Sequence, residues 1–324
     1  MSAVAPVVSL GPLAYRSERM ARVVDLARRV AGSDANVLLT GESGTGKERL
    51  ARYLHEAGPR HAGPFVTVAC TTVPSELVES TLFGHEKGAF TGATERHEGR
   101  FEQANGGTLL IDGVDELAPS LQGKLLRVVQ ERAFERLAGT RTIAVDVRIL
   151  ASTQVDLEER VAEGRFRKDL YYRLNVIRID LPPLRERLED LPILAEEILR
   201  HLALGRGQEP RRLSEEALQR LKGHDWPGNV RELRNTLESA TIFHEGAVIP
   251  AAAIRIESGR RPEPESSARR IAAAARQGVT LSELEEIYIR EVLRRTGNRR
   301  SEAARILGIN RKTLLEKRKR YRIP

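Results

Sequence analysis

The stretch Val37–Glu48, which reads VLLTGESGTGKE, decides the fold of this 324-residue chain. A short apolar strand runs into a glycine-rich turn, and a helical segment follows. Glycines let the backbone wrap a phosphate, the free N–H groups of a helix N-terminus bind it, and Lys47 can reach the β- and γ-phosphates of a nucleotide. The loop therefore predicts a nucleotide site made of Gly41, Glu42, Ser43, Gly44, Thr45, Gly46, Lys47 and Glu48.

Apolar runs separated by helical segments continue outward from this loop. Phe65–Val68, Thr108–Ile111, Val145–Leu150 and Val176–Ile179 predict four further strands. Apolar residues at consecutive positions are typical of a parallel sheet that is buried on both faces. Residues 10–180 are therefore predicted to form an α/β domain.

The rest of the chain predicts helices. Residues 181–256 form a small helical domain, with helices from Leu191 to about Gly205, from a Ser214 cap to Lys222, and from an Asn229 cap to about His244. Residues 257–279 contain the glycines, prolines and serines of a linker. Residues 280–324 form a last helical unit that starts with a capping box at Thr280.

The net charge of +8 is concentrated at one end. The last 26 residues hold ten basic and two acidic side chains, so the other 298 residues are neutral overall. Such a basic segment is typical of a nucleic-acid-binding domain, although a solvated basic helix would look alike. The single cysteine, Cys70, excludes an intramolecular disulfide and a cysteine-based zinc finger. We see neither a signal peptide nor an apolar run near the roughly 20 residues that span a membrane, which predicts a cytoplasmic protein.

The basic segment also has the spacing of a helix-turn-helix. Small Ala304 allows two helices to cross closely, Gly308 takes the turn, and Leu314 fills the core. The amphipathic helix Leu281–Arg295, with Leu281, Leu284, Ile287 or Tyr288, and Val292 on one side, is the expected dimerisation element. The final helix, residues 311–320, would read DNA. The predicted contacts are Asn310, Arg311, Lys312, Thr313, Lys317 and Arg320.

Four stretches carry a resemblance to a known family. They are LFGHEKGAFTGA at Leu82–Ala93, FRKDLYYRL at Phe166–Leu174, LPPLRER at Leu181–Arg187 and WPGNVREL at Trp226–Leu233. The chain resembles the bacterial sigma-54-dependent transcriptional activators from about Leu10 to its C-terminus. Their Glu after the P-loop lysine matches Glu48, where other P-loops have a Ser or Thr that ligates Mg²⁺.

The resemblance implies an AAA+ domain with a parallel sheet, a helical lid at residues 181–256 and a Fis-like helix-turn-helix at residues 280–324. It also implies ATP and Mg²⁺ as cofactors, and double-stranded DNA and sigma-54 RNA polymerase as partners. Dimers and a hexameric ring are expected, in the bacterial cytoplasm. Only about ten residues precede the match, so we expect no N-terminal sensor domain.

The GAFTGA loop would contact sigma-54 through Phe90, Thr91 and Gly92. The glycines and small Ala89 and Ala93 make a mobile surface loop on which Phe90 and Thr91 are the only larger groups. An apolar side chain at a polar loop tip is typical of a partner site. The alternative is that Phe90 packs back on its own domain.

By the same resemblance, Arg167 and Arg173 are arginine fingers that reach the γ-phosphate of a neighbouring subunit. Ion pairs with Asp169 or Glu163 are the alternative that the spacing alone favours. Arg231 matches the sensor arginine of the lid. Gln154 takes the place of a polar sensor at the end of a strand.

The chain departs from the family at one catalytic pair. Asp112 can hold Mg²⁺, but Gly113 stands where the family has the Glu that polarises water, and Ala69 stands where it has the partner Asn. Loss of a general base lowers rates by roughly 10²–10⁴. Two hypotheses remain: an ATP-driven activator, or a DNA-binding regulator that binds ATP without turnover. Asp115 or Glu116 is a possible substitute, and a protein-unfolding chaperone is disfavoured by the DNA-binding unit.

Overall fold

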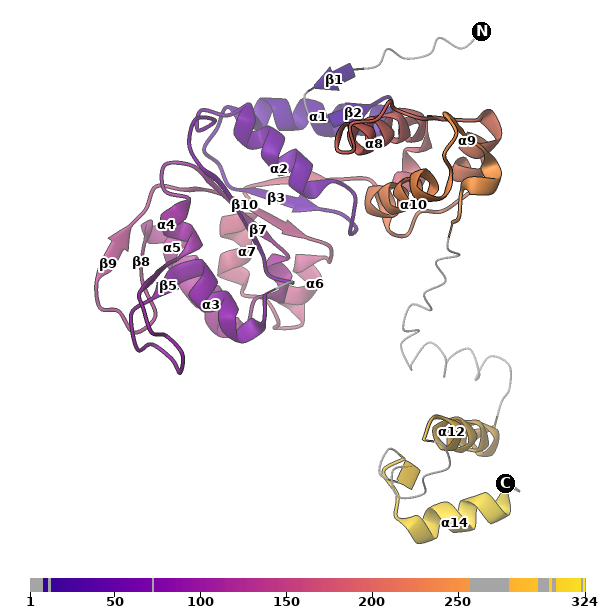
Figure 1. Cartoon of the computed structure of the whole chain (residues 1–324). Coiled ribbons are helices and arrows are strands. Elements are labelled where there is room, and N and C mark those ends of the chain that lie inside the picture. The colour runs from indigo at the N-terminus through magenta and orange to yellow at the C-terminus, as the bar shows by residue number, and fades with distance from the viewer. Residues whose placement is uncertain are drawn as a thin grey trace. The chain divides into compact units, whose positions relative to one another are not determined.

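The computed structural model describes residues 8–10, 13–71, 73–256, 280–296, 303–304, 307–321 and 323. The chain divides into two compact units, Met1–Ile256 and Glu257–Pro324. The predicted linker, residues 257–279, lies outside the described residues. Figure 1 shows the first unit with its sheet and helices and the second with α12 and α14.

The first unit is built on a parallel sheet of five strands in the order β11-β3-β10-β7-β4. The strands are β3 (Val37–Thr40), β4 (Phe65–Ala69), β7 (Thr108–Asp112), β10 (Arg148–Thr153) and β11 (Ile177–Asp180). Their register pairs Asp112 with Ala69 on one side and with Ser152 on the other. The carboxyl ends of the strands therefore meet at one edge, as the α/β prediction requires.

Helices cover both faces of this sheet (Figure 1). α1 (Glu18–Ala31) and α2 (Lys47–Glu56) pack on one face, where Leu39 and Leu150 are buried. The other face carries α3 (Ser75–Phe83), α4 (Arg100–Gln103), α5 (Pro119–Glu131), α6 (Leu157–Ala162) and α7 (Lys168–Leu174). Burial on both faces explains the apolar strands, and the fold class predicted from the sequence is confirmed.

One predicted strand is misplaced. The apolar run Val145–Leu150 was expected to pair throughout, but β10 begins at Arg148 and continues to Thr153. The Val145 amide instead donates to the Arg132 carbonyl at 2.8 Å, beside the hairpin of β8 (Ala133–Glu135) and β9 (Thr142–Ala144). The run therefore includes the end of a hairpin as well as the start of a core strand.

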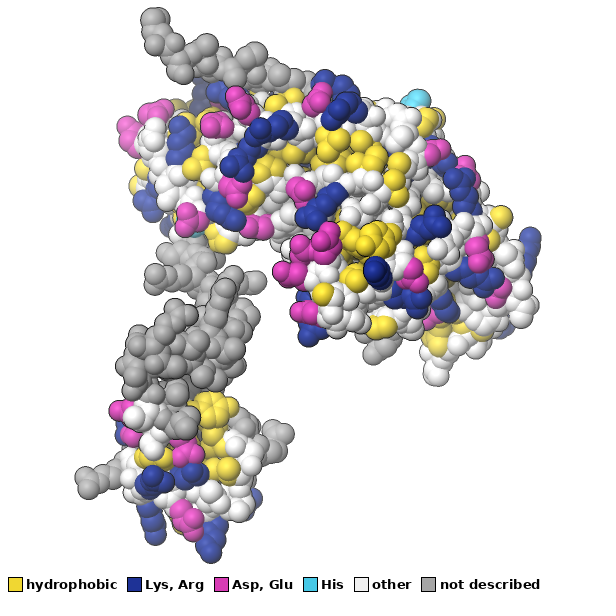
Figure 2. All heavy atoms as spheres, turned by 180° about the vertical axis from the view of Figure 1, so that it is seen from behind, with side chains coloured by type: hydrophobic (Ala, Val, Ile, Leu, Met, Phe, Trp, Pro, Cys, Tyr) yellow, Lys and Arg dark blue, Asp and Glu magenta, His cyan; other side chains and the backbone are white. Residues whose placement is uncertain are grey.

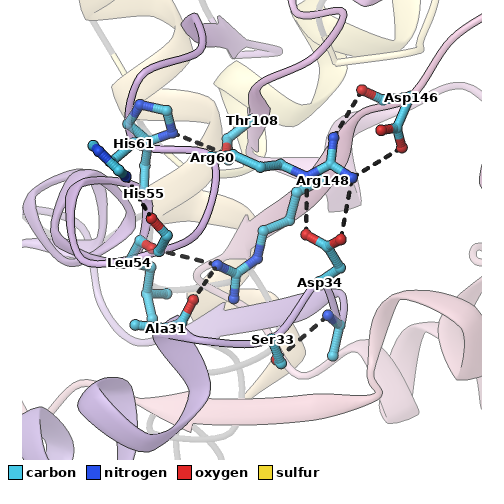
Figure 3. A network of polar contacts seen from close by, with 12 residues as sticks. Ala31, Ser33, Asp34, Leu54, His55, Arg60, His61, Thr108, Asp146 and Arg148 are labelled. Atoms are coloured by element: carbon cyan, nitrogen blue, oxygen red, sulfur yellow. Dashed lines mark hydrogen bonds and ion pairs between the residues drawn. The ribbon is translucent and has the colours of Figure 1, made fainter.

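A buried arginine fixes α2 against the sheet (Figure 3). Arg148 is 2% exposed, and its guanidinium donates to the carbonyls of Ala31 at 3.0 Å and Leu54 at 3.3 Å. These carbonyls lie at the C-terminal ends of α1 and α2, where backbone acceptors lack helical partners. Burial lowers the pKa of Arg148. Because the other end of α2 begins at Lys47, this contact positions the glycine-rich loop.

The lid consists of α8 (Leu191–Leu204), α9 (Glu215–Lys222) and α10 (Asn229–Phe243) around the buried Trp226. The Ser214 hydroxyl accepts from the Ala217 amide at 3.1 Å, as its predicted capping role requires. The capping role predicted for Asn229 is wrong, because Gly228 precedes the helix and Asn229 is its first residue, with φ of +51°. Its side chain turns toward the glycine-rich loop instead.

The second unit contains α12 (Leu281–Arg295) and α14 (Arg311–Arg320) around Ile289, Val292 and Leu314. The capping box is present, with the Thr280 amide donating to Glu283 Oε2 at 2.8 Å. Asn310 caps α14 by accepting from the Thr313 amide at 2.8 Å. Tyr288 is exposed, so the buried face of α12 does not include it.

Candidate nucleotide site

A cavity of about 520 Å³ lies between the carboxyl edge of the sheet and the lid. It brings together segments more than 180 positions apart in the sequence, from Ser43 to Arg234. Of the predicted nucleotide residues, those in its lining are Ser43, Gly44, Gly46, Lys47, Glu48, Asp112, Gln154 and Arg231. The other lining residues are Arg49, Thr71, Gly113, Ser152, Thr153, Ile198, Val230 and Arg234.

The loop is already folded around its lysine. Lys47 Nζ donates to the carbonyls of Gly41 at 2.7 Å and Glu42 at 2.9 Å. Burial lowers the pKa of Lys47, and the charge of Asp112 acts in the opposite direction. Gly46 has φ of +108°, and a Cβ at this position would meet no heavy atom within 4 Å outside the two neighbouring residues. The loop therefore leaves open space at the N-terminus of α2, where an anion binds most favourably.

The lid holds the loop from the opposite side. A Cβ added at Gly44 would lie 2.3 Å from the Gly228 carbonyl oxygen, so this position requires glycine. The Val230 amide donates to the Gly44 carbonyl at 3.0 Å. Arg231 Nη1 donates to Ser43 Oγ at 2.7 Å. The loop and the start of α10 thus form one connected structure.

Glu42 serves this connection rather than lining the cavity. Its carboxylate accepts from Arg185 at 2.9 and 2.7 Å and from Asn229 Nδ2 at 3.1 Å. The bonds from Arg185 hold the pKa of Glu42 below its ordinary value. Asn229 Oδ1 in turn accepts from the Leu184 amide at 2.7 Å.

Arg187 makes a further contact of the same kind. Its buried guanidinium donates through Nη2 to the Thr45 carbonyl at 2.6 Å, and burial lowers its pKa. The sequence predicted no role for Arg185 or Arg187, and for Asn229 it predicted only a helix cap. The only hint of a role was that two of the matched stretches contain arginines and an asparagine. The stretches do not indicate which groups these side chains contact.

The end of the cavity where the sequence predicted the catalytic residues lies at the end of β7. Asp112 accepts a hydrogen bond from the Ser152 hydroxyl of the neighbouring strand. Gly113 has φ of +78° and ψ of +48°, and its amide donates to the Ser152 carbonyl at 3.0 Å. A Cβ at Gly113 would lie 3.1 Å from Thr71 Cγ2. Ala69 pairs with Asp112 across the sheet, so the two departures from the family lie at the same edge.

Two other groups lie near this end. Asp115 Oδ1 is buried and has no hydrogen-bond partner among the described residues, and its charge acts on both Lys47 and Cys70. Burial, followed by the charges of Asp112 and Asp115, raises the pKa of the Cys70 thiol to about 12. Cys70 is therefore a protonated core residue at neutral pH, which makes it a poor nucleophile.

The two predicted arginine fingers lie outside the cavity lining, with Arg167 at the residue before α7 and Arg173 within that helix. Arg167 forms two hydrogen bonds with the Asp169 carboxylate, at 3.0 and 2.7 Å, which is the ion pair that spacing alone favours. The Arg173 guanidinium makes no ion pair with any residue that the structure describes. Tyr172 between them is 63% exposed. Within one copy of the chain, neither arginine lines the cavity that holds the predicted nucleotide residues.

The GAFTGA loop is a tight turn at the surface. Gly88 and Gly92 have φ of +84° and +104°, and the Gly88 amide donates to the Ala93 carbonyl at 2.8 Å. Phe90 is 40% exposed, with its ring centroid 4.9 Å from that of His85. The side chain thus touches its own domain and still presents apolar surface.

The predicted DNA-contacting side chains differ in exposure. Arg311, Lys312 and Arg320 are exposed, while Thr313 Oγ1 donates to Asn310 at 2.9 Å. Lys317 Nζ lies 2.6 Å from Glu285 Oε1 of α12, so this ammonium already has a partner inside its own unit. Figure 2 shows basic side chains in dark blue on the second unit.

Family models match along nearly the whole chain. The sigma-54 interaction domain matches residues 13–180, the AAA+ ATPase lid domain residues 185–270, and the bacterial regulatory protein, Fis family, residues 280–321. The chain belongs to the sigma-54-dependent transcriptional regulators. It combines an AAA+ nucleotide-binding module with a Fis-type DNA-binding unit, as the sequence predicted. None of the helices in the described part of the chain is long and apolar enough to cross a membrane.

Relatives with assigned names are similar over most of the chain. The transcriptional regulatory protein FlbD of Caulobacter vibrioides is 45% identical over 96% of this chain and 70% of its own length. ZraR of Salmonella typhimurium is 44% identical over 93% and 67%. The Nif-specific regulatory protein of Azotobacter vinelandii is 46% identical over 90% and 55%.

Solved structures of NtrX from Brucella abortus are also similar. The complex with ATP has a TM-score of 0.69 and 35% identity, over 96% of this chain and 69% of that one. The complex with ADP has a TM-score of 0.70 and 34% identity, over 98% and 70%.

Proposed function

We propose that this regulator binds Mg–ATP in the cavity between sheet and lid. While bound to DNA in the bacterial cytoplasm, it uses this nucleotide to remodel sigma-54 RNA polymerase. One observation carries the proposal: Lys47, Asp112 and Arg231 line the same cavity. A cation, a metal-ligating carboxylate and a lid arginine around a helix N-terminus are what a nucleoside triphosphate requires.

The residues present fit the magnesium ion. Mg²⁺ in nucleotide sites takes one or two carboxylates and completes its shell with phosphate oxygens and water. The described residues contain no group of three or more His, Cys, Asp or Glu side chains that could hold a metal ion. Asp112 and Glu48 both line the cavity, and Asp112 is the residue that would hold the ion, which neutralises phosphate charge when bound.

The chain's own residues divide the remaining work. Lys47 and the open backbone at Gly46 bind the phosphates, and Gln154 can hydrogen-bond a phosphate or a water. Arg231 couples nucleotide binding to the lid, because it lies on α10 and bonds Ser43 of the loop. Arg167 and Arg173 act on the nucleotide of a neighbouring copy, which favours assembly into a hexameric ring. Phe90, Thr91 and Gly92 contact sigma-54, and α12 supports dimerisation on DNA.

Regulation by bound ATP without turnover is the second candidate function. Gly113 and Ala69 favour it, because neither provides a group that orients water beside Asp112. The P-loop and the cavity are present in both candidates. What distinguishes them is the hydrolysis rate.

A steady-state ATPase assay against protein concentration tests the two functions. Turnover that rises with concentration and is abolished by Arg173→Ala supports a ring that hydrolyses ATP. Tight ATP binding with negligible turnover at every concentration supports the second candidate. Failure of the protein to bind ATP, with Lys47→Ala as the matched loss-of-binding control, refutes both.

A further inference from the structure

The rotation of α14 about its own axis is fixed by its contacts with α12. Leu314 is 1% exposed and belongs to the core of the second unit. Lys317 Nζ lies 2.6 Å from Glu285 Oε1 of α12, and Tyr321 Oη donates to Glu285 Oε2 at 2.5 Å. Residues three and seven positions after Leu314 share its face of the helix, so this face is turned to the interior of the unit.

The side of α14 that faces away from α12 carries one apolar residue among charged ones. The exposed residues of the helix are Arg311, Lys312, Leu315, Glu316, Lys319 and Arg320. Leu315 is 42% exposed, although it directly follows the buried Leu314. Arg311, Lys312 and Lys319 are three or four positions from Leu315, so they are its neighbours on the helix surface. Leu315 is therefore an apolar spot bordered by three cations.

These cations determine what can cover the leucine. A single exposed leucine is ordinary on a protein surface, but basic side chains around it attract the phosphates of DNA. An α-helix that is held by phosphates on both sides fits the major groove. Thymine is the base that places a methyl group in this groove, where the methyl makes apolar contacts with side chains. Leu315 can gain free energy from such a contact, whereas it has no group that could hydrogen-bond another base.

We propose that Leu315 is a specificity-determining residue of this regulator, and that its side chain contacts the C5 methyl group of a thymine in the major groove. The inference rests on the proposed DNA binding and adds the base that this position of α14 selects. The cations beside Leu315 supply affinity for any duplex, while the leucine discriminates thymine from the other bases.

Replacement of thymine by uracil tests the contact, because uracil lacks only the C5 methyl group. The full chain first selects duplexes from a random-sequence pool, and the enriched duplex is then synthesised with deoxyuridine at one thymine position at a time. Loss of a buried methyl group predicts that one of these replacements weakens binding about 3–5-fold in a gel-shift titration. Leu315→Ala should bind the thymine and uracil duplexes equally. Leu315→Met, with an apolar side chain of similar volume, should retain part of the preference.

Lys319→Ala is the matched control on the same exposed side of α14. It removes a charge and leaves the leucine, so it should weaken the binding of both duplexes alike and keep the ratio between them. The proposal is overturned if selection enriches no thymine position, or if the wild-type chain binds every uracil duplex as tightly as the thymine duplex. It is also overturned if Leu315→Ala keeps the wild-type ratio, because another group then reads the methyl. Failure of the wild-type chain to bind any duplex would instead refute the proposed DNA binding.

Discussion

The substitution Gly113→Glu places a carboxylate directly after Asp112, and its effects on stability and on ATP turnover can be measured separately. Gly113 has φ of +78°, a conformation that a residue with a Cβ adopts at a cost of about 1–2 kcal/mol. A substitution also brings its Cβ within 3.1 Å of Thr71 Cγ2. At roughly 2–4 °C per kcal/mol, Gly113→Glu should lower the melting temperature of the first unit by about 2–8 °C.

The loss of stability should not prevent a gain in ATP turnover. A stability of about 5–15 kcal/mol leaves the variant folded at 25 °C, whereas a general base is worth roughly 10²–10⁴ in rate. We therefore expect Gly113→Glu to be less stable and yet to hydrolyse ATP faster. Adding Ala69→Asn should change the rate further, and the pair should deviate from additivity because Ala69 pairs with Asp112, next to Gly113.

Circular dichroism melts and a coupled ATPase assay measure the two effects. Gly113→Ala controls for strain without a carboxylate and should lose stability with no gain in rate. Thr71→Ser removes the methyl group that the new Cβ meets, so it should restore part of the stability of the Glu variant. An unchanged melting temperature would refute the argument from strain. If the unmodified protein already turns over as fast as its Glu-bearing relatives, Asp115 is the base and Asp115→Asn should stop hydrolysis.

The remaining predictions concern the other surfaces and the lid. Deleting residues 299–324 should abolish DNA binding and leave ATP binding intact in a gel-shift and titration experiment; Arg311→Ala should cost roughly 1–3 kcal/mol of affinity and relax one base position. Phe90→Ala and Thr91→Ala should abolish capture of sigma-54 in a pull-down while nucleotide and DNA binding stay near normal. A double-mutant cycle on Glu42 and Arg185, read by chemical denaturation, should give a coupling of about 0.2–1 kcal/mol, because both side chains are about 40% exposed and the pair is screened. Since the folded pKa of Glu42 is lowered, this coupling should be present above its unfolded pKa and disappear as the pH falls through the folded value.

Local patterns were enough to predict most of the fold. The apolar runs at Val37–Thr40 and Thr108–Ile111 are buried strands because sequence and burial share one cause, a sheet covered on both faces. The predicted bounds of the strand at Val145–Leu150 were wrong, because this apolar run includes the end of a hairpin as well as the start of β10. Asn229 was misread for a different reason. Its residue type suits a cap, but its side chain is used by a loop far away in the sequence.

In the cavity, too, residues in local motifs were predictable, whereas contacts between distant segments were not. Lys47, Asp112, Gln154 and Arg231 were predictable because each stands in a local motif, and all four line one space. The bonds that join loop and lid were not predictable, because Arg185 and Glu42 are separated by 143 positions and only the fold brings them together. Arg49 was missed since an arginine on an amphipathic helix ordinarily indicates a solvated face.

These contacts also bear on whether ATP can regulate without being hydrolysed. A phosphate that enters the loop competes for Lys47 Nζ, which now bonds the carbonyls of Gly41 and Glu42, and for Arg231, which now bonds Ser43. Glu42 and Ser43 are the residues that Arg185 and Asn229 hold from the lid side. We therefore expect occupancy of the loop to change the free energy of the lid position before any bond in the nucleotide is broken. We expect a regulator with Gly113 in place of a catalytic carboxylate to retain this coupling, so that nucleotide binding alone would shift the lid even where turnover is slow.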